Sequence, residues 1–236
     1  MTTDQPQPQP DDQSHHVVAY FEQFFATIIQ AYERTGDPAA LVFDNYVRWK
    51  GLPADAIRLE DRIEHLSPYF SVLEYPAEHR FAAYCTLGAS YQIIPGSQQS
   101  FGDPRGVRHE YILHAIPDHA ETVMELLIMV SEYPFKHDRE VGPGFVLPIG
   151  EPVVEGSHME YLYFSYPFMD EPDIYHNPRG QIDREDVLVQ TLWVFPIYKS
   201  EVDFIRERGP EAFEELCYAK HTKIYDADDF MRLPYV

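Results

Sequence analysis

The feature that most constrains the fold is the run VLVQTLWVFPIY at residues 187–198. Nearly every residue in this run is apolar or aromatic, so neither side of an extended chain would suit contact with water. Strands of this kind occur where a sheet is buried on both faces. The run therefore predicts a central strand in a sheet that has helices on its flanks.

Other stretches with strand or helix patterns surround this run. Short apolar and aromatic stretches bounded by Gly and Pro are typical of strands, and apolar residues that recur every three or four positions are typical of helices. Within 157–168, alternation predicts Met159, Tyr161, Tyr163 and Ser165 on one face of a strand, with Glu160, Leu162, Phe164 and Tyr166 on the other. The expected strands lie at 70–75, 81–87, 107–116 and 157–168, with a short one bracketed by Gly and Pro within 142–153. The expected helices lie at 17–35, 118–137, 199–208 and 210–221.

The chain divides into a short tail and one domain. Residues 1–16 alternate Gln and Pro and are expected to be disordered. Residues 17–36 predict an amphipathic helix whose apolar face meets the core, since few basic residues line its polar side. We find no internal repeat and no linker after residue 16. The sequence therefore predicts one α+β domain at 17–236, with a mixed, mostly antiparallel β-sheet flanked by helices.

Two helix starts carry capping signals. Asp118 is followed three residues later by Glu121, which is the pattern of a capping box. Ser200 is followed by Glu201, which predicts a hydroxyl cap and a carboxylate near the positive end of the helix. A binding role is the alternative interpretation of Glu201.

The stretch RHEYILH at 108–114 resembles a zinc-protease motif, but its spacing is wrong. The motif needs two histidines four residues apart on one helix face, and His109 and His114 are five apart. The surrounding residues predict a strand, on which an odd spacing puts the two rings on opposite faces. Three carboxylates at Asp226, Asp228 and Asp229 lack the glycine turn and late Glu of a calcium loop. We predict no metal site, and a solvated acidic tail at 225–234.

The net charge excludes one large class of partner and favours another. The chain carries 39 acidic and 18 basic residues, for a net charge of −21 at pH 7. A surface this acidic does not bind a phosphate backbone, so no nucleic-acid partner is expected. It attracts a basic protein partner instead, although such charge also serves solubility alone.

Other features indicate a cytoplasmic protein without a membrane span. Cys85 and Cys217 lie far apart and are expected to be reduced thiols. No run of 18 apolar residues and no secretory signal pattern is present in the sequence.

Enzyme signatures are lacking, so no catalytic residue and no cofactor is predicted. The sequence contains no Gly-x-Ser-x-Gly, phosphate loop or dinucleotide fingerprint. The alternative is a hydrolase or metal-dependent enzyme in which the fold pairs His114 or His158 with Glu110 or Glu160.

The strongest binding candidate is YPFMDEPDIYHNPRG at 166–180, directly after an expected strand. Loops that a sheet holds in place are common binding sites, and aromatic side chains among carboxylates suit a partner with Lys or Arg. The structural alternative is an acidic, solvated loop. The predicted partner-binding residues are Phe168, Asp170, Glu171, Asp173 and Tyr175.

The stretch LWVFPIYKSEVDFIRERGPEAFEEL at 192–216 resembles the suppressor-of-fused domain family. It has that family's apolar strand ending in Pro196-Ile197, a helix opened by Ser200-Glu201, a break at Gly209 and a second helix. RHEYILHAIP, GFVLPIGEPV and MEYLYFSYPF stand upstream in the order that the family uses. The resemblance covers roughly residues 65–222 and lies in the order of blocks rather than in one motif.

The resemblance implies a protein-binding domain. Animal members are inhibitors that clamp a transcription-factor peptide partly as an added strand, and they are not enzymes. Bacterial relatives resemble immunity proteins that neutralise toxins, and this chain is similar to the bacterial single-domain form. The expected function is therefore a cytoplasmic, non-catalytic immunity protein, and the alternative within the same class is a regulator of an endogenous protein.

Overall fold

A computed structural model describes residues 38–58, 63–78, 80–167, 181–220 and 229–236, together with Gln23, Ala26, Thr27 and Gln30. Its centre is an eight-stranded sheet in the order β1-β2-β3-β4-β8-β6-β5, and β7 also pairs with β8. The strands are β1 Asp55–Arg58, β2 Ser71–Glu78, β3 Phe81–Leu87, β4 Arg108–Ala115, β5 Val146–Pro148, β6 Met159–Ser165, β7 Gln181–Asp183 and β8 Leu188–Tyr198. The helices are α2 Ala39–Lys50, η1 Ala89–Tyr91, α3 Ser97–Ser100, η2 Pro117–His119, α4 Ala120–Lys136, α5 Lys199–Arg208 and α6 Pro210–Lys220.

Strand β8 is the central strand that its sequence predicts. It pairs in parallel with β4 on one side, and antiparallel with β6 and β7 on the other. Every residue from Leu188 to Ile197 is buried. All other strand pairs are antiparallel, so the prediction of a mixed, mostly antiparallel sheet in an α+β fold is confirmed.

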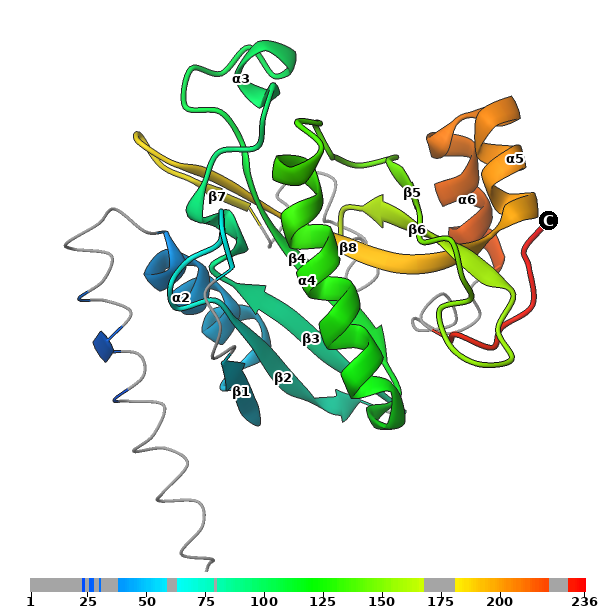
Figure 1. Cartoon of the computed structure of the whole chain (residues 1–236), viewed down its shortest axis with the longest axis horizontal. Coiled ribbons are helices and arrows are strands. Elements are labelled where there is room, and N and C mark those ends of the chain that lie inside the picture. Colours follow the sequence, from blue (N-terminus) through cyan, green and yellow to red (C-terminus); the bar gives the residue numbers. More distant parts are fainter. Residues whose placement is uncertain are drawn as a thin grey trace, which may run out of the picture.

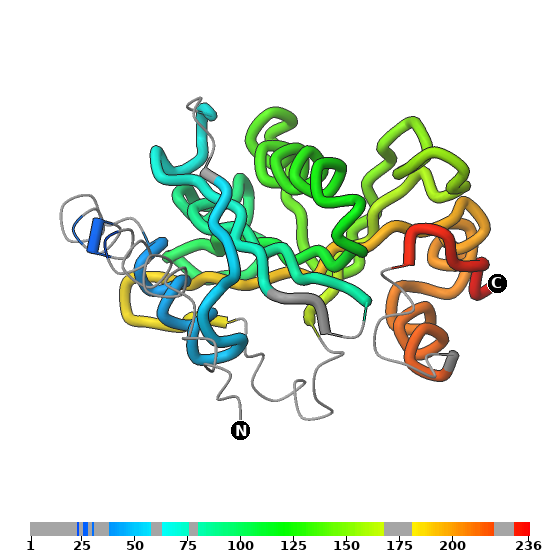
Figure 2. Tube along the Cα trace, turned by 90° about the horizontal axis from the view of Figure 1, so that it is seen from below, coloured from blue at the N-terminus to red at the C-terminus, as the bar shows by residue number. Residues whose placement is uncertain are grey.

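Helices cover both faces of the sheet (Figures 1 and 2). On one face α4 lies across β3 and β4, and its Val123, Leu127 and Val130 are buried against the sheet. On the other face α2 packs near β3 and β7, while the α5–α6 pair packs near β6 and β8. Alternate residues of β8 serve the two sides, since Leu192 enters the α4 core and Trp193 enters the α5–α6 core. This arrangement explains why β8 has no polar side.

The predicted alternation along β6 is correct from Tyr161 onwards and wrong for Met159. The register against β8 shifts between Met159 and Tyr161, which marks a bulge. As a result Met159 joins Leu162 and Phe164 in the α4 core, instead of sharing the face of Tyr163. An extra residue in one strand reverses the side to which the preceding residue points.

The predicted capping box at Asp118 is wrong. Residues Pro117–His119 form the short helix η2, and α4 begins only at Ala120. His119 occupies the cap position and makes no side-chain cap hydrogen bond. Because Pro117 begins η2, Asp118 lies inside that short helix instead of at the cap position of α4.

The N-terminal predictions lie almost entirely outside the described residues. Of the helix expected at 17–35, only Gln23, Ala26, Thr27 and Gln30 are described, and these four are helical. The boundary between tail and domain at residue 16 also lies outside them. None of the helices within the described ranges combines the length and apolarity needed to cross a membrane.

Candidate interaction site

The five predicted partner-binding residues lie outside the described residues. Phe168, Asp170, Glu171, Asp173 and Tyr175 all fall within 168–180. The structure does define the two points from which this segment starts and ends.

The segment leaves and rejoins the sheet beside the central strand. Ser165, the last residue of β6, lies opposite Trp193, and Gln181, the first residue of β7, lies opposite Gln190. Strand β4 occupies the other edge of β8 along 189–193. Strands β6 and β7 therefore follow one another along the same edge of β8, and 166–180 connects them from the middle of the sheet.

The departure point is tied to α6 through one carboxylate. The Tyr163 hydroxyl donates to Glu214 Oε1 at 3.0 Å, and the Ser165 hydroxyl donates to the same oxygen at 2.7 Å. Burial raises the pKa of Tyr163, and the negative charge of Glu214 raises it further. The phenol therefore stays protonated and remains a donor, which fixes the end of β6 against α6.

The return point is tied to the loop before β4 through Arg105. Its guanidinium donates to Asp183 Oδ1 at 2.7 Å, to Asp103 Oδ2 at 2.6 Å, and to the Arg184 carbonyl oxygen. The side-chain hydrogen bond from Arg105 lowers the pKa of Asp103 to about 2. One cation thus joins two carboxylates at the end of β7, and the segment is held at both of its ends.

Glu110 is buried completely and accepts several hydrogen bonds. Its carboxylate accepts hydrogen bonds from the Thr86 and Ser90 hydroxyls at 2.6 Å each, and from the backbone N–H groups of Gly88 at 2.9 Å and Ser90 at 3.1 Å. Burial raises the pKa of Glu110 to about 7, and these hydrogen bonds oppose that rise. The contacts close the turn that follows β3, so the group holds a loop in place.

The strand geometry of β4 keeps His114 apart from Glu110, with which the enzyme alternative pairs it. His109 and His114 lie on opposite faces of β4, as the strand prediction requires, because His109 contacts Tyr111 and His114 contacts Trp193. His114 and Glu110 share a face, but four residues along a strand separate them by about 13 Å.

His158 and Glu160 are exposed at the start of β6, and β8 separates them from β4. Within the described ranges, no three His, Cys, Asp or Glu side chains are grouped closely enough to hold a metal ion.

A second buried carboxylate, Glu201, has a role that the sequence does not indicate. It is wholly buried, and Arg232 binds both of its oxygens at 2.7 and 2.8 Å. The backbone N–H of Tyr198 donates to it at 2.8 Å, as in a helix cap. The backbone N–H of Tyr235 adds a fourth hydrogen bond at 2.9 Å. The prediction that Glu201 favours the start of the helix is therefore correct but incomplete. The predicted hydroxyl cap at Ser200 is wrong, because Tyr198 occupies the cap position and Ser200, inside α5, makes an exposed contact of 3.4 Å with the Val236 carbonyl oxygen.

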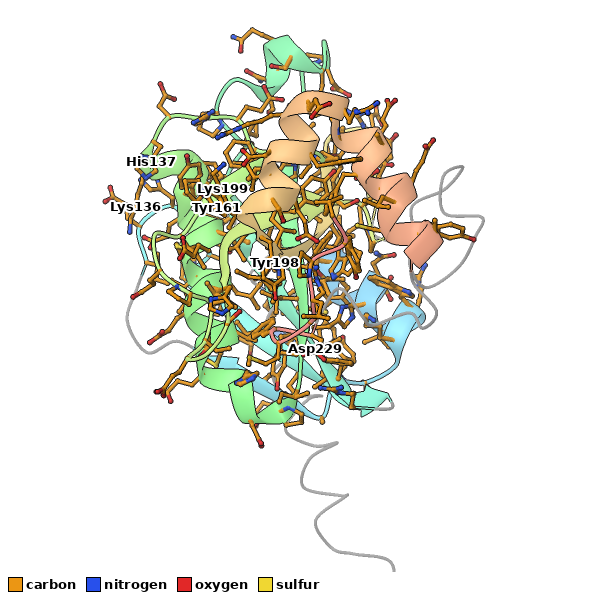
Figure 3. The ribbon with its side chains drawn as sticks, turned by 90° about the vertical axis from the view of Figure 1, so that its right-hand side faces the viewer. Lys136, His137, Tyr161, Tyr198, Lys199 and Asp229 are labelled. Atoms are coloured by element: carbon orange, nitrogen blue, oxygen red, sulfur yellow. The ribbon has the colours of Figure 1, made fainter. Side chains whose placement is uncertain are left out.

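The prediction of a solvated tail at 225–234 is wrong for Phe230 and Arg232, which are buried, whereas Met231, Leu233 and Pro234 are exposed. Tyr235, just after this range, is buried too, and Asp226 and Asp228 lie outside the described residues. Figure 3 shows this side of the molecule, with Tyr198 and Asp229 labelled. The sequence pattern that could have predicted this burial is FMRLPYV at 230–236, in which apolar or aromatic residues surround a lone Arg.

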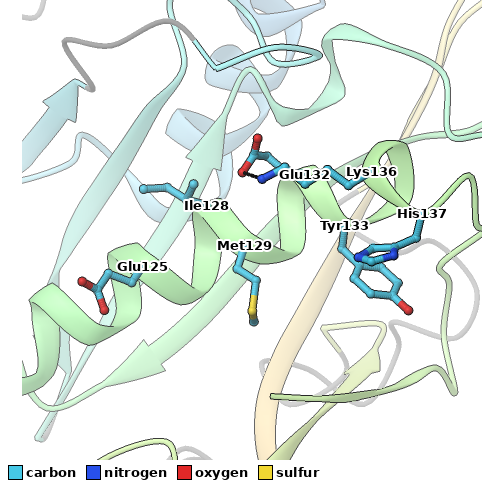
Figure 4. Close-up of a pocket in the computed structure, with 7 residues that line it drawn as sticks. All are labelled: Glu125, Ile128, Met129, Glu132, Tyr133, Lys136 and His137. Carbon is cyan, nitrogen blue, oxygen red and sulfur yellow. Dashed lines mark hydrogen bonds and ion pairs between the residues drawn. The ribbon is translucent and has the colours of Figure 1, made fainter. Parts of the chain in front are cut away.

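A shallow hollow lies along the outer side of α4 (Figure 4). It has a volume of about 310 Å³, and half-buried Ile128, Met129 and Tyr133 supply its apolar surface. Glu132 and Lys136 form an ion pair of 2.7 Å at its edge. No buried polar group points into this hollow from the described residues, so nothing identifies a ligand for it.

The described residues form an α+β domain with a mixed sheet, helices on both faces and a buried central strand. Comparison with known families places the chain within one of them. The family model of the suppressor of fused protein (SUFU) matches residues 60–228. The chain therefore belongs to the suppressor of fused family, as the sequence resemblance implies.

Solved structures of the family share this fold at low identity. A putative SUFU homologue from Neisseria gonorrhoeae is 18% identical with a TM-score of 0.59, over 85% of this chain and 96% of that one. A chain of a Sufu–Fu complex is 11% identical with a TM-score of 0.60, over 86% and 93%. Drosophila Suppressor of Fused is 13% identical with a TM-score of 0.50, over 72% of this chain but 43% of that one. A search of curated proteins gave no match.

Proposed function

We propose that this chain is a non-catalytic protein-binding domain that neutralises a basic protein partner, as an immunity protein does to its cognate toxin. The observation that carries the proposal is how the fold anchors Ser165 and Asp183, which flank the segment 166–180. A segment with three carboxylates and three aromatic side chains connects β6 to β7, and both of these strands pair with the same edge of the central strand. Segments displayed from a rigid sheet are suited to binding.

Charge supports a basic partner. The chain has a net charge of −21, and charge of this size speeds the encounter with an oppositely charged protein. The Sufu–Fu complex supplies a precedent for protein binding within the family. The proposed contact residues remain Phe168, Asp170, Glu171, Asp173 and Tyr175.

The first test is capture of the partner. The tagged chain is incubated with a lysate of its own organism at low salt, washed, and eluted with high salt for mass spectrometry. The proposal expects a basic protein released by salt. Expression of that protein alone should arrest growth, and co-expression of this chain should restore it.

Two results would redirect the proposal. A captured partner that is harmless when expressed alone would favour the regulator of an endogenous protein. Failure to capture any protein under several growth conditions would contradict the binding function itself.

A further inference from the structure

The C-terminal segment Asp229–Val236 packs against the rest of the domain through side chains that enter two different core clusters. Its Phe230, Arg232 and Tyr235 are buried, whereas Pro234 is exposed and Met231, Leu233 and Val236 are exposed at 55%, 82% and 44%. Beyond a single turn at its start, it has no regular structure of its own. Figure 2 shows it in red beside the α5–α6 pair.

From this arrangement we propose that the surface beneath the segment is a recognition groove for an extended peptide with an arginine between two aromatic residues. The chain's own segment fills the groove, and a partner segment of the same chemistry competes for it. The inference rests on the proposed function in one respect only, namely that the competing segment belongs to a basic partner.

The arginine site is built by residues distant in sequence from Arg232. Glu201 at the start of α5 binds the guanidinium with both oxygens, and the Pro196 carbonyl oxygen accepts from Nη2 at 3.2 Å. The guanidinium also lies 5.5 Å from the ring centre of Tyr198. A bidentate carboxylate beside an aromatic ring selects Arg over Lys, because only the planar guanidinium satisfies both oxygens at once.

The aromatic site is equally separate from the segment. The ring of His119, in η2, stacks on Phe230 at 5.4 Å with an interplanar angle of 11°. The Ser157 hydroxyl donates to the Phe230 carbonyl oxygen at 2.7 Å. Phe230 joins the core on the α4 face, and Tyr235 joins the core beside α5 and α6. The segment therefore joins the two layers through three buried side chains and several backbone contacts.

Specific placement of the segment is the role that we assign to the buried Glu201–Arg232 pair. Apolar side chains of similar volume usually stabilise a fold at least as well as a buried Arg–carboxylate pair. Charge at this position instead ensures that only a segment with a correctly placed arginine can fill the groove. Every contact of Arg232 and Phe230 with the groove is one that a separate peptide can make.

The test uses the peptide DFMRLPYV, labelled with a fluorophore, and full-length protein. In the wild-type chain the tethered segment competes at an effective concentration in the millimolar range, so the added peptide binds weakly. The variant Arg232→Ala weakens that competitor, and we expect it to bind the peptide at least about tenfold more tightly than wild type. Its melting temperature should rise as peptide is added.

Two controls distinguish recognition from nonspecific adhesion. The chain with Leu233→Ala alters the most exposed side chain of the segment, so it should bind the peptide as weakly as wild type. A peptide with Ala in place of Arg should lose at least about tenfold in affinity for the Arg232→Ala chain. If this chain does not fold alone, the wild-type peptide should restore its folding in trans.

Failure of the peptide either to bind or to restore folding would overturn the groove proposal. Because no partner is present in this assay, such a failure leaves the proposed function standing. Conversely, peptide binding by a chain that captures no partner would support the groove and contradict the proposed function.

Discussion

At the scale of single residues, two buried carboxylates stabilise different parts of the fold. Glu110 closes the turn that follows β3 with hydrogen bonds from hydroxyl and backbone donors. Glu201 joins the start of α5 to the C-terminal segment through Arg232. Their environments differ, since Glu201 has a cation beside it and Glu110 has only neutral donors.

The raised pKa of Glu110 predicts a dependence of stability on pH. Its pKa rises from 4.5 to about 7 in the folded state, so the folded protein binds this proton more tightly than the unfolded chain. That contribution is present at low pH and is lost as pH rises towards 7. Between about pH 5.5 and pH 8, we expect the free energy of unfolding of wild type to fall by about 2 kcal/mol more than that of Glu110→Gln. Urea denaturation of both proteins at both pH values measures this difference.

An equal pH dependence in wild type and Glu110→Gln would contradict this account. It would mean that the hydrogen bonds to the carboxylate cancel the effect of burial.

The Glu201–Arg232 pair predicts a large cost when one partner is removed. The variant Glu201→Ala leaves a buried guanidinium without its counter-ion, and we expect a loss of about 3–5 kcal/mol in the free energy of unfolding. The matched control is Asp203→Ala, which breaks the exposed ion pair with Lys199 and should cost less than about 1 kcal/mol. Chemical denaturation compares the two. Similar small losses in both variants would show that the C-terminal segment contributes little to the fold.

At the scale of elements, the start of α4 has the sequence pattern of a capping box but lacks the side-chain cap hydrogen bond that this pattern predicts. Asp118 lies in η2, and no side-chain cap hydrogen bond forms at the start of α4. We therefore expect Asp118→Ala to change the free energy of unfolding by less than about 0.5 kcal/mol. A loss of about 1 kcal/mol or more, the usual effect of removing a helix cap, would show that Asp118 does cap the helix. Thermal or urea unfolding of the variant decides between the two.

Elements whose signal is local could be predicted, and those that depend on distant residues could not. The apolar run of β8 and the short apolar and aromatic stretches of β3 and β4 predict strands of the sheet, because a strand buried on both faces has apolar residues at consecutive positions. The bulge in β6 has no recognisable pattern in the sequence, although it moves Met159 to the other face of the sheet.

The same distinction applies to the candidate site. The sequence shows the acidic and aromatic composition of 166–180, but it does not show the hydrogen bonds that hold the residues flanking this segment. Ser165 meets Glu214 and Arg105 meets Asp183 across 49 and 78 residues of chain, respectively. Likewise, Glu201 reads as a helix cap because the cap is local, whereas its partner Arg232 lies 31 residues away.

At the scale of the whole molecule, the acidic surface predicts salt-dependent association. Exposed charges are screened over about 10 Å at 0.1 M salt. Once the partner is identified, we expect the Kd of the complex to rise at least about tenfold between about 0.05 M and about 0.3 M NaCl. Most of that change should lie in the association rate, which stopped-flow measurement resolves. A Kd indifferent to salt would contradict the electrostatic part of the proposal.

The most direct test of the central claim is quantitative capture from lysate with three versions of the full-length chain. One is wild type, and the second carries Asp170→Asn, Glu171→Gln and Asp173→Asn. The third removes the same charge elsewhere, with Glu151→Gln, Glu155→Gln and Glu215→Gln at exposed positions. The proposal predicts one basic protein retained by wild type and the third version, with at least about tenfold less on the second. Equal retention by all three, or retention of nothing by wild type, would contradict a binding site at 166–180.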